Sequence, residues 1–360
     1  MEFALTDEQE LLQQQLGIAL SRLSPLARIR RHAASDAVFA EDIWLGMSEF
    51  GVPGLLIAAE HGGMGLGLLD ASLVSEVLGR HCTPLPFLGP VLAAPIAIAA
   101  AGSQEQQSRM LPQMAAGALR IGIALSEALA GTRAGGGVTL RDGKLFGTSL
   151  FAVDVQGAHQ VLVADGDDGL HLVDIGAPGL SIKPLVTVDK TRSVAALTFD
   201  AVRAETLPGA TSAVHNRIAS ALYVAIAADL LGVGGFMMDT AVEYAKVRRQ
   251  FSRPIGSFQA VKHLCAEMAA ELEPGRALMW YAAYAQDANL PDATLAAMHA
   301  KAYMADAARI AARNSIEVHG GIGITDDLGL HYWFKRATFG GQVFGGATRL
   351  RELAANGQGD

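Results

Sequence analysis

The sequence predicts a multidomain protein with a helical N-terminal domain, a small middle β-domain of sandwich or barrel type, and a C-terminal antiparallel four-helix bundle. Residues 1–117 carry apolar side chains at helical spacing, and residues 118–210 change to short strand-like runs separated by turns. Residues 211–360 return to helical spacing in long, alanine-rich stretches. The length of 360 residues and the 51% hydrophobic content provide for a sizeable core, which excludes an intrinsically disordered chain.

The N-terminal segment begins with a helix-start signal. Thr6 and Gln9 have the spacing of a capping box, and leucines follow at helical spacing. A glycine-rich loop lies near residues 51–65. Asp70 is then expected to cap a helix that runs to Gly79.

The middle segment alternates strand and turn signals. Strands are expected at residues 121–125, 160–164 and 195–199. Asp142 and Asp168 are each followed by glycine, a pair that is typical of tight turns. No helix of useful length fits between these strands, so this segment predicts the β-domain.

The C-terminal segment accommodates three long helices, at residues 213–249, 257–287 and 292–319. Prolines and glycines mark the breaks between them. Long apolar helices with short connections predict an antiparallel bundle.

The charge and cysteine content exclude several functions. The 28 basic and 36 acidic residues give a net charge of −8, which offers no basic surface to nucleic acid or to an anionic membrane. Asp229 interrupts the apolar run after Arg217, so no membrane span is expected. Cys82 and Cys265 lie far apart with no metal-type spacing, which favours a cytoplasmic protein without disulfides or a metal site.

Two glycine clusters and one arginine cluster are the first candidate sites. Residues 232–235 read GVGG but do not follow a strand, so close helix packing is favoured over dinucleotide binding. Residues 248–254 place three arginines at a helix end, where they are either a solvated terminus or a phosphate site. Gly320 and Gly321 either cap a helix or let a ligand phosphate approach the backbone.

Five segments, taken in order, resemble the acyl-CoA dehydrogenase family over essentially the whole chain. Residues 3–9, which read FALTDEQ, are similar to the family's first helix, and residues 44–65 end in its glycine loop as EHGGMG. The other three segments are 124–132 (ALSEALAGT), 244–259 (YAKVRRQFSRPIGSFQ) and 317–323 (EVHGGIG).

This resemblance implies FAD as the cofactor, held between the β-domain and the bundle with help from a neighbouring subunit. Six residues would surround the isoalloxazine and its adjoining chain: Leu125, Ser126, Gly131, Thr132, Phe151 and Val153. Eight residues would reach the diphosphate or adenine half of a neighbour's FAD: Arg248, Gln250, Phe251, Ile255, Phe258, Glu317, Gly320 and Gly321.

The resemblance also implies α,β-desaturation of an acyl-CoA thioester, with electron-transfer flavoprotein as the electron acceptor. A glutamate normally removes the α-proton, from one of two places in the family. Those two places are Gly345 and Leu222 in this chain, and Tyr223 replaces a companion arginine that commonly helps to hold CoA. Glycine and leucine cannot accept a proton, so a base would have to come from elsewhere.

The nearest replacements in the sequence are Glu127, Asp229 and His319, none of which is in a matching position. Residues 328–337, which read LGLHYWFKRA, resemble the endings of bacterial family members that act on steroid side chains and other bulky acyl groups. Several of these form heterotetramers in which one degenerate subunit lacks the base. We therefore expect a subunit of this degenerate kind, an oxidoreductase of lipid metabolism or steroid degradation.

Three alternatives remain at this point. The chain could be a self-sufficient homomeric dehydrogenase, forming a dimer of dimers, with a displaced base. It could be a non-enzymatic scaffold subunit, or a flavin monooxygenase built on the same fold, for which no carboxylate base is required.

Overall fold

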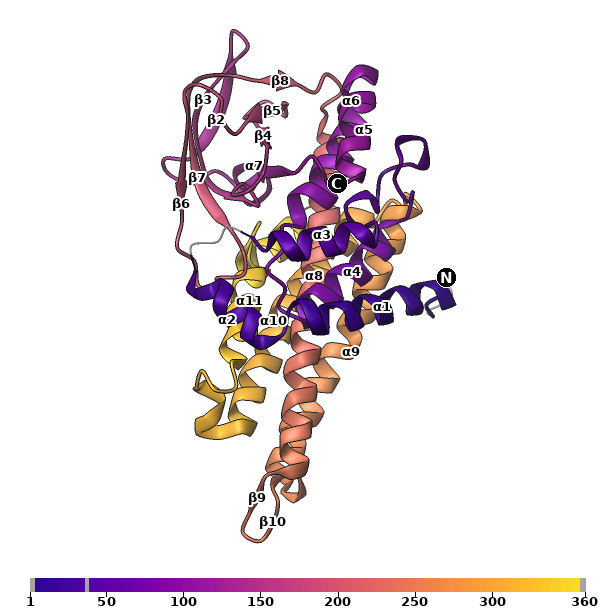
Figure 1. Ribbon diagram of the computed structural model, residues 1–360, viewed down its shortest axis with the longest axis vertical. Coiled ribbons are helices and arrows are strands. Elements are labelled where there is room, and N and C mark those ends of the chain that lie inside the picture. Colours follow the sequence, from indigo (N-terminus) through magenta and orange to yellow (C-terminus); the bar gives the residue numbers. More distant parts are fainter. Residues whose placement is uncertain (1–3, 36–38, 357–360) are drawn as a thin grey trace. The chain divides into compact units, whose positions relative to one another are not determined.

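The computed structural model describes residues 4–35 and 39–356, and its internal contacts divide the chain into two compact units (Figure 1). The first unit comprises Met1–Arg30, Ser72–Thr83 and Tyr223–Asp360. The second comprises Arg31–Ala71 and Pro84–Leu222. Three helices contribute residues to both units: α2 (Leu26–Ala34), α4 (Leu68–Arg80) and α8 (Ser212–Val247).

The first unit is built on the predicted C-terminal bundle, which is confirmed. In Figure 1, α8, α9 and α10 lie side by side, and the short β9–β10 hairpin closes the end of α8 and α9. Other helices of this unit are α1, α11 and α12, together with parts of α2 and α4. The bounds are α1 Asp7–Leu23, α2 Leu26–Ala34, α4 Leu68–Arg80, α8 Ser212–Val247, β9 Arg249–Gln250, β10 Arg253–Pro254, α9 Gln259–Asp287, α10 Ala293–His319, α11 Leu330–Gln342 and α12 Ala347–Asn356.

Of the two predicted helix starts, the one at Thr6 is confirmed and the one at Asp70 is corrected. The capping box of α1 is confirmed, because the Thr6 hydroxyl accepts a hydrogen bond from the Gln9 amide and the Gln9 side chain accepts one from the Thr6 amide. The position of Asp70 is corrected, since α4 begins at Leu68 and Asp70 lies in its first turn. Its carboxylate still accepts from the Gly67 amide at 3.1 Å, so it satisfies a donor at the helix start from inside the helix.

Two glycines let α4 and α8 approach closely. A Cβ added at Gly232 would lie 1.9 Å from the Glu76 carbonyl oxygen, and one added at Gly79 would lie 2.1 Å from the Asp229 carbonyl oxygen. The helix-packing interpretation of residues 232–235 is therefore confirmed at Gly232. Helix α8 is long and apolar enough to span a bilayer, but 83% of its apolar window is buried inside the protein.

The second unit contains the predicted β-domain, and hydrogen bonds connect its eight strands in one mixed sheet. The order is β6-β7-β3-β1-β4-β5-β8, with β2 paired to β3. Only the β1–β4 pair is parallel in this sheet as described. The strands are β1 Ile121–Ala124, β2 Gly137–Arg141, β3 Lys144–Val153, β4 Gln160–Ala164, β5 Leu170–Asp174, β6 Leu180–Pro184, β7 Val194–Arg203 and β8 Glu205–Thr206.

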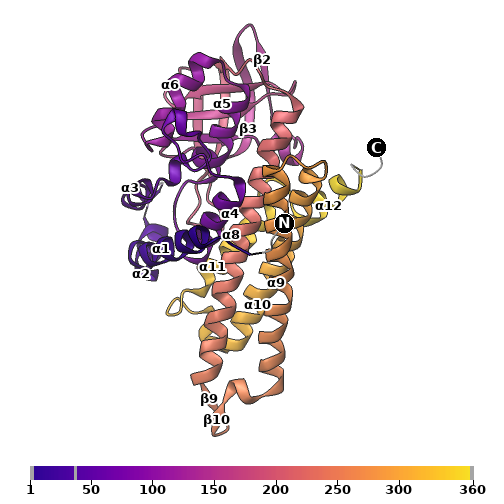
Figure 2. The ribbon, with the colours of Figure 1, turned by 90° about the vertical axis from the view of Figure 1, so that its right-hand side faces the viewer.

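Helices complete this unit, and Figure 2 shows α5 and α6 in front of the sheet. The sheet core consists of buried aliphatic side chains from alternate positions of several strands, together with Phe199. Near the end of β3, the buried Asp154 carboxylate accepts from the amides of Phe87 at 3.1 Å and Gly89 at 3.0 Å, and burial raises its pKa. The helices are α3 Glu41–Glu49, α5 Ala94–Ala101, α6 Gln104–Ala115 and α7 Ser126–Ala130.

Candidate functional site

The six residues predicted to surround a flavin gather where β1 leads into the short helix α7 beside β3. The Ser126 hydroxyl donates to the Phe151 carbonyl oxygen at 2.5 Å, which fixes the start of α7 to β3. Val153 pairs with Ile123 of β1. Leu125 and Val153 are buried, whereas the Phe151 ring is 39% exposed. Gly131 ends α7 with a φ of +90°, and Thr132 follows it.

Glu127 lies in the same corner but does not have the contacts of a free base. One carboxylate oxygen accepts from the Ser149 hydroxyl at 2.9 Å, and the other accepts from the Leu150 amide at 2.7 Å. Both oxygens therefore hold α7 against β3. This engagement disfavours Glu127 as the displaced base.

The arginine cluster lies on the hairpin between α8 and α9, at one end of the bundle (Figure 1). Arg248 and Gln250 are exposed, and Phe251 is 88% exposed at the hairpin turn. The Phe251 ring contacts the Phe258 ring edge-on, with centroids 6.1 Å apart. The guanidinium carbon of Arg253 lies 4.1 Å from the Phe258 ring centroid, and Ile255 begins the single turn before α9. This end of the bundle thus presents cationic and aromatic groups to solvent.

The C-terminal end of α10 packs against the last turns of α8, which lead into this hairpin. Tyr244, one turn before Arg248 on α8, stacks on His319 with ring centroids 4.6 Å apart. Gly320 caps α10 with a φ of +64°, which confirms the capping interpretation. A Cβ at Gly320 or Gly321 would meet no atom within 4 Å, and Glu317 is exposed on the last turn.

These residues fit the diphosphate and adenine half of a dinucleotide. Exposed guanidinium groups can form bidentate bonds with phosphate oxygens, and an exposed aromatic ring can stack on a base. Open space at Gly320 and Gly321 leaves their backbone accessible to a ligand. The eight residues predicted for this half of FAD thus lie on the hairpin, on the single turn before α9 and at the C-terminal end of α10, and their role toward FAD stays a prediction.

The other two weak base candidates are engaged in structural contacts. The Asp229 carboxylate receives three hydrogen-bond contacts from Arg336, at 3.2, 3.0 and 2.5 Å, and both side chains are buried. His319 is 5% exposed, and its Nδ1 lies 2.7 Å from the Ser315 carbonyl oxygen. Burial lowers the pKa of His319. Asp229 is therefore an ion-pair partner of Arg336, and the Nδ1 contact holds the His319 ring against its own helix.

The two positions at which the sequence analysis expects the family base hold no ionisable side chain here. Leu222 is fully buried on α8, and Gly345 lies in the turn between α11 and α12 with a φ of +104°. Behind this turn is a charged side chain that the sequence analysis missed. Lys301 of α10 is 0% exposed and donates to the Gly345 carbonyl oxygen at 2.5 Å. A lysine within an alanine-rich helical stretch was the available signal, but periodicity alone does not distinguish it from a solvated position.

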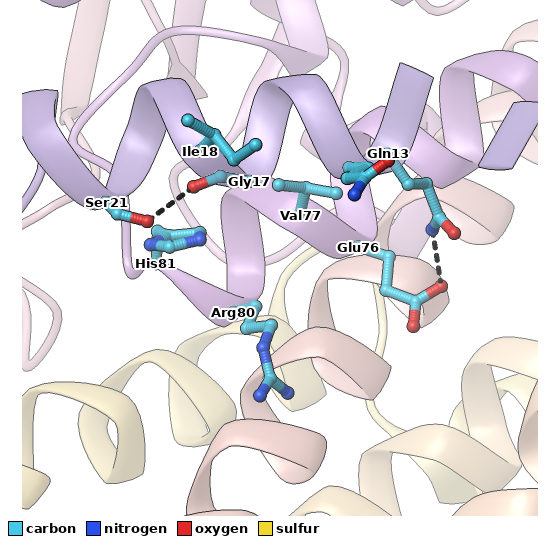
Figure 3. A pocket seen from close by; sticks show the side chains of 9 residues that line it. Gln13, Gly17, Ile18, Ser21, Glu76, Val77, Arg80 and His81 are labelled. Atoms are coloured by element: carbon cyan, nitrogen blue, oxygen red, sulfur yellow. Dashed lines mark hydrogen bonds between the residues drawn. The ribbon is translucent and has the colours of Figure 1, made fainter. Parts of the chain in front are cut away.

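A separate groove of about 480 Å³ lies between α1 and α4 (Figure 3). Its walls include Gln13, Ile18, Ser21, Val77 and His81. Burial, reinforced by the neighbouring Arg80 charge, lowers the pKa of His81 to about 4, so this imidazole is neutral at pH 7. None of the residues predicted for FAD or for catalysis lies in this groove.

Comparison with known proteins identifies the family. Residues 6–118 match the acyl-CoA dehydrogenase N-terminal domain, and residues 213–355 match the acyl-CoA dehydrogenase C-terminal domain. The acyl-CoA dehydrogenase IpdE2 of Mycobacterium tuberculosis is 31% identical over 333 residues, which are 92% of this chain and 91% of that protein. The chain belongs to the acyl-CoA dehydrogenase family.

Solved structures agree with this acyl-CoA dehydrogenase assignment. The chain is similar to the Tcur3481-Tcur3483 steroid ACAD G363A variant, with a TM-score of 0.89 and 30% identity, over 98% of this chain and 99% of that one. It is also similar to the ChsE4-ChsE5 complex from Mycobacterium tuberculosis, with a TM-score of 0.90 and 25% identity, over the full length of both chains. The family resemblance drawn from the sequence is confirmed.

Proposed function

We propose that this chain is the base-lacking subunit of a hetero-oligomeric, FAD-dependent acyl-CoA dehydrogenase. The observation that carries the proposal is the absence of a proton acceptor at both family base positions, Gly345 and Leu222. The engagement of Glu127, Asp229 and His319 in structural contacts adds support. A partner subunit of the same family would then supply the base.

Desaturation of an acyl-CoA needs a base for the α-proton and an acceptor for the β-hydride, and bound FAD supplies the second. This chain's contribution would be to bind and orient. Arg248 and Gln250 would hold the diphosphate of a neighbour's FAD, while Phe251 and Phe258 would pack against its adenine half. The corner formed by Ser126 and Phe151 would lie against the isoalloxazine. Removing any of these groups would weaken FAD retention more than it would alter proton transfer.

The substrate proposed is a CoA thioester with a bulky acyl group, such as a steroid side chain. The support is the similarity to the steroid ACAD variant and to the ChsE4-ChsE5 complex. The first of those names contains the word steroid, and the second describes a complex of ChsE4 with ChsE5. We further propose electron-transfer flavoprotein as the electron acceptor, a cytoplasmic location, and a division into domains at residues 1–117, 118–210 and 211–360.

Co-expression tests the proposal. The chain is purified alone and together with a base-carrying family subunit, and flavin absorbance, subunit stoichiometry and acyl-CoA turnover are measured. Little flavin and little turnover from the chain alone, with both restored in the complex, is the expected result. A yellow single chain that desaturates acyl-CoA at normal rates would contradict it and favour the self-sufficient enzyme. An assembled complex without FAD would favour a scaffold, and oxygen-dependent product would favour a monooxygenase.

A matched pair of variants localises the FAD contribution. Arg248→Met at the hairpin is expected to lower the FAD content of the assembled complex. Arg217→Met, which removes the same charge from an exposed position near the opposite end of α8, is the control. Equal FAD content in both variants would remove Arg248 from the proposed site.

A further inference from the structure

The turn between α11 and α12 has a strained backbone. Phe344 has a φ of +54° and Gly345 a φ of +104°, so two consecutive residues adopt left-handed conformations. For a non-glycine residue such as Phe344 this conformation is unfavourable and persists only where the surroundings enforce it. Within the backbone, the turn is tied by the Gly345 amide, which donates to the Gln342 carbonyl oxygen at 3.2 Å.

A buried lysine holds the same turn from outside. The Lys301 ammonium donates to the Gly345 carbonyl oxygen at 2.5 Å and lies 5.6 Å from the centroid of the Tyr223 ring. Among the described residues, no carboxylate forms an ion pair with Lys301, and burial is the only influence that shifts its pKa. An ammonium without a counter-ion is costly to bury, and a methionine of similar length would avoid that cost.

The side-chain space at residue 345 is nevertheless open. A Cβ built on Gly345 would lie 3.7 Å from its nearest neighbour, a methyl carbon of Leu350, which is an ordinary contact. Lys301 therefore binds the backbone of the turn, and its side chain does not fill the space into which a Cβ at residue 345 would project. A costly buried charge and a strained turn thus meet at a position that has open space around it, although its φ of +104° disfavours a residue with a side chain.

We propose that Lys301 is a positioning residue that fixes the α11–α12 turn and so determines where residue 345 lies. The hydrogen bond to the Gly345 carbonyl oxygen stabilises a backbone shape that Phe344 disfavours. This inference depends on the proposed function in one respect, which is that residue 345 is taken as a position of the family's catalytic base. In this chain the turn keeps its shape without carrying a base.

Amide hydrogen exchange measured by mass spectrometry tests the proposal on the full-length chain. Lys301→Met removes the donor, Lys301→Gln keeps a shorter neutral donor, and Lys262→Met alters an exposed lysine of α9 as a control. Loss of one buried hydrogen bond predicts about tenfold faster exchange in residues 343–350 of Lys301→Met. Lys301→Gln should fall between this variant and wild type, and Lys262→Met should match wild type.

Unchanged exchange of this segment in a folded Lys301→Met protein would overturn the proposal. Faster exchange spread through α8, α9 and α10 would also overturn it, because Lys301 would then stabilise the bundle as a whole. If Lys301→Met does not fold, Lys301→Gln decides by the same criterion. Hydrogen exchange at the turn is measured on the single chain and does not depend on a partner subunit. If the single chain proves active as a dehydrogenase, that finding would contradict the proposed function but would not change the exchange result for Lys301.

Discussion

Replacing Arg336 with methionine should destabilise the protein strongly, because it leaves the Asp229 carboxylate buried without its partner. The two side chains are 1% and 5% exposed, and Arg336 Nε and Nη2 contact both carboxylate oxygens at 2.5 to 3.2 Å. Arg336 also donates through Nη1 to the Thr83 carbonyl oxygen at 2.9 Å. Breaking a buried ion pair from one side costs about 3–5 kcal/mol, and the bond to Thr83 adds about 1 kcal/mol. We therefore expect a loss of roughly 4–6 kcal/mol.

A double-mutant cycle separates the ion pair from simple packing. Arg336→Met, Asp229→Leu and the double variant are unfolded in urea at pH 7 and followed by circular dichroism. Because the double variant leaves no unpaired charge, it should be more stable than Arg336→Met alone. The reasoning is refuted if Arg336→Met costs less than about 1 kcal/mol, or if the two single losses simply add in the double variant.

Three further stability predictions follow from single contacts. Burial lowers the pKa of Lys301 to about 7, whereas the pKa of a lysine in the unfolded chain is near 10.4. Between these two pH values the unfolded chain therefore binds more protons than the folded protein, so the stability of the wild-type protein rises with pH. Lys301→Met removes this pH dependence. The melting temperature of Lys301→Met minus that of wild type should therefore be higher at pH 6.5 than at pH 9.5, and a difference that does not change with pH would contradict this prediction. Gly232→Ala should lower the melting temperature because its Cβ would lie 1.9 Å from the Glu76 carbonyl oxygen, whereas Gly17→Ala, with no atom within 4 Å, should leave it unchanged or raise it. Equal effects of the two substitutions would exclude the packing explanation. Thr6→Ala should cost about 1 kcal/mol by removing the capping box of α1, measured by urea unfolding against Thr6→Ser, which keeps the hydroxyl and should be nearly neutral.

Local sequence patterns predicted the elements because the interactions that form them are short in sequence. The capping box at Thr6 and Gln9 spans three residues, and the three long helices lie within a few residues of their expected bounds. The strands expected at 121–125, 160–164 and 195–199 are likewise confirmed as β1, β4 and β7, although β1 ends at Ala124. Asp70 was the exception, because its carboxylate satisfies the helix start from inside the first turn.

The engagement of Glu127 and Asp229 could not be predicted, because each depends on a residue distant in sequence. Glu127 contacts Ser149 and Leu150 across the α7–β3 corner, and Asp229 contacts Arg336, which lies 107 residues later in the sequence. The sequence alone does not distinguish a carboxylate that acts as a base from one that forms an ion pair. Only the folded contacts assigned these two to structural roles.

The sequence by itself determined the family, the order of the helical and β segments, and the lack of a carboxylate at Gly345 and Leu222, since these are properties of residue type and short-range spacing. The tertiary structure alone decided that Lys301 lies buried against the Gly345 carbonyl oxygen, because α10 and the turn after α11 meet only when the bundle packs. Burial then changes the chemistry of that lysine, since an ammonium removed from water has a lowered pKa and makes a stronger hydrogen bond.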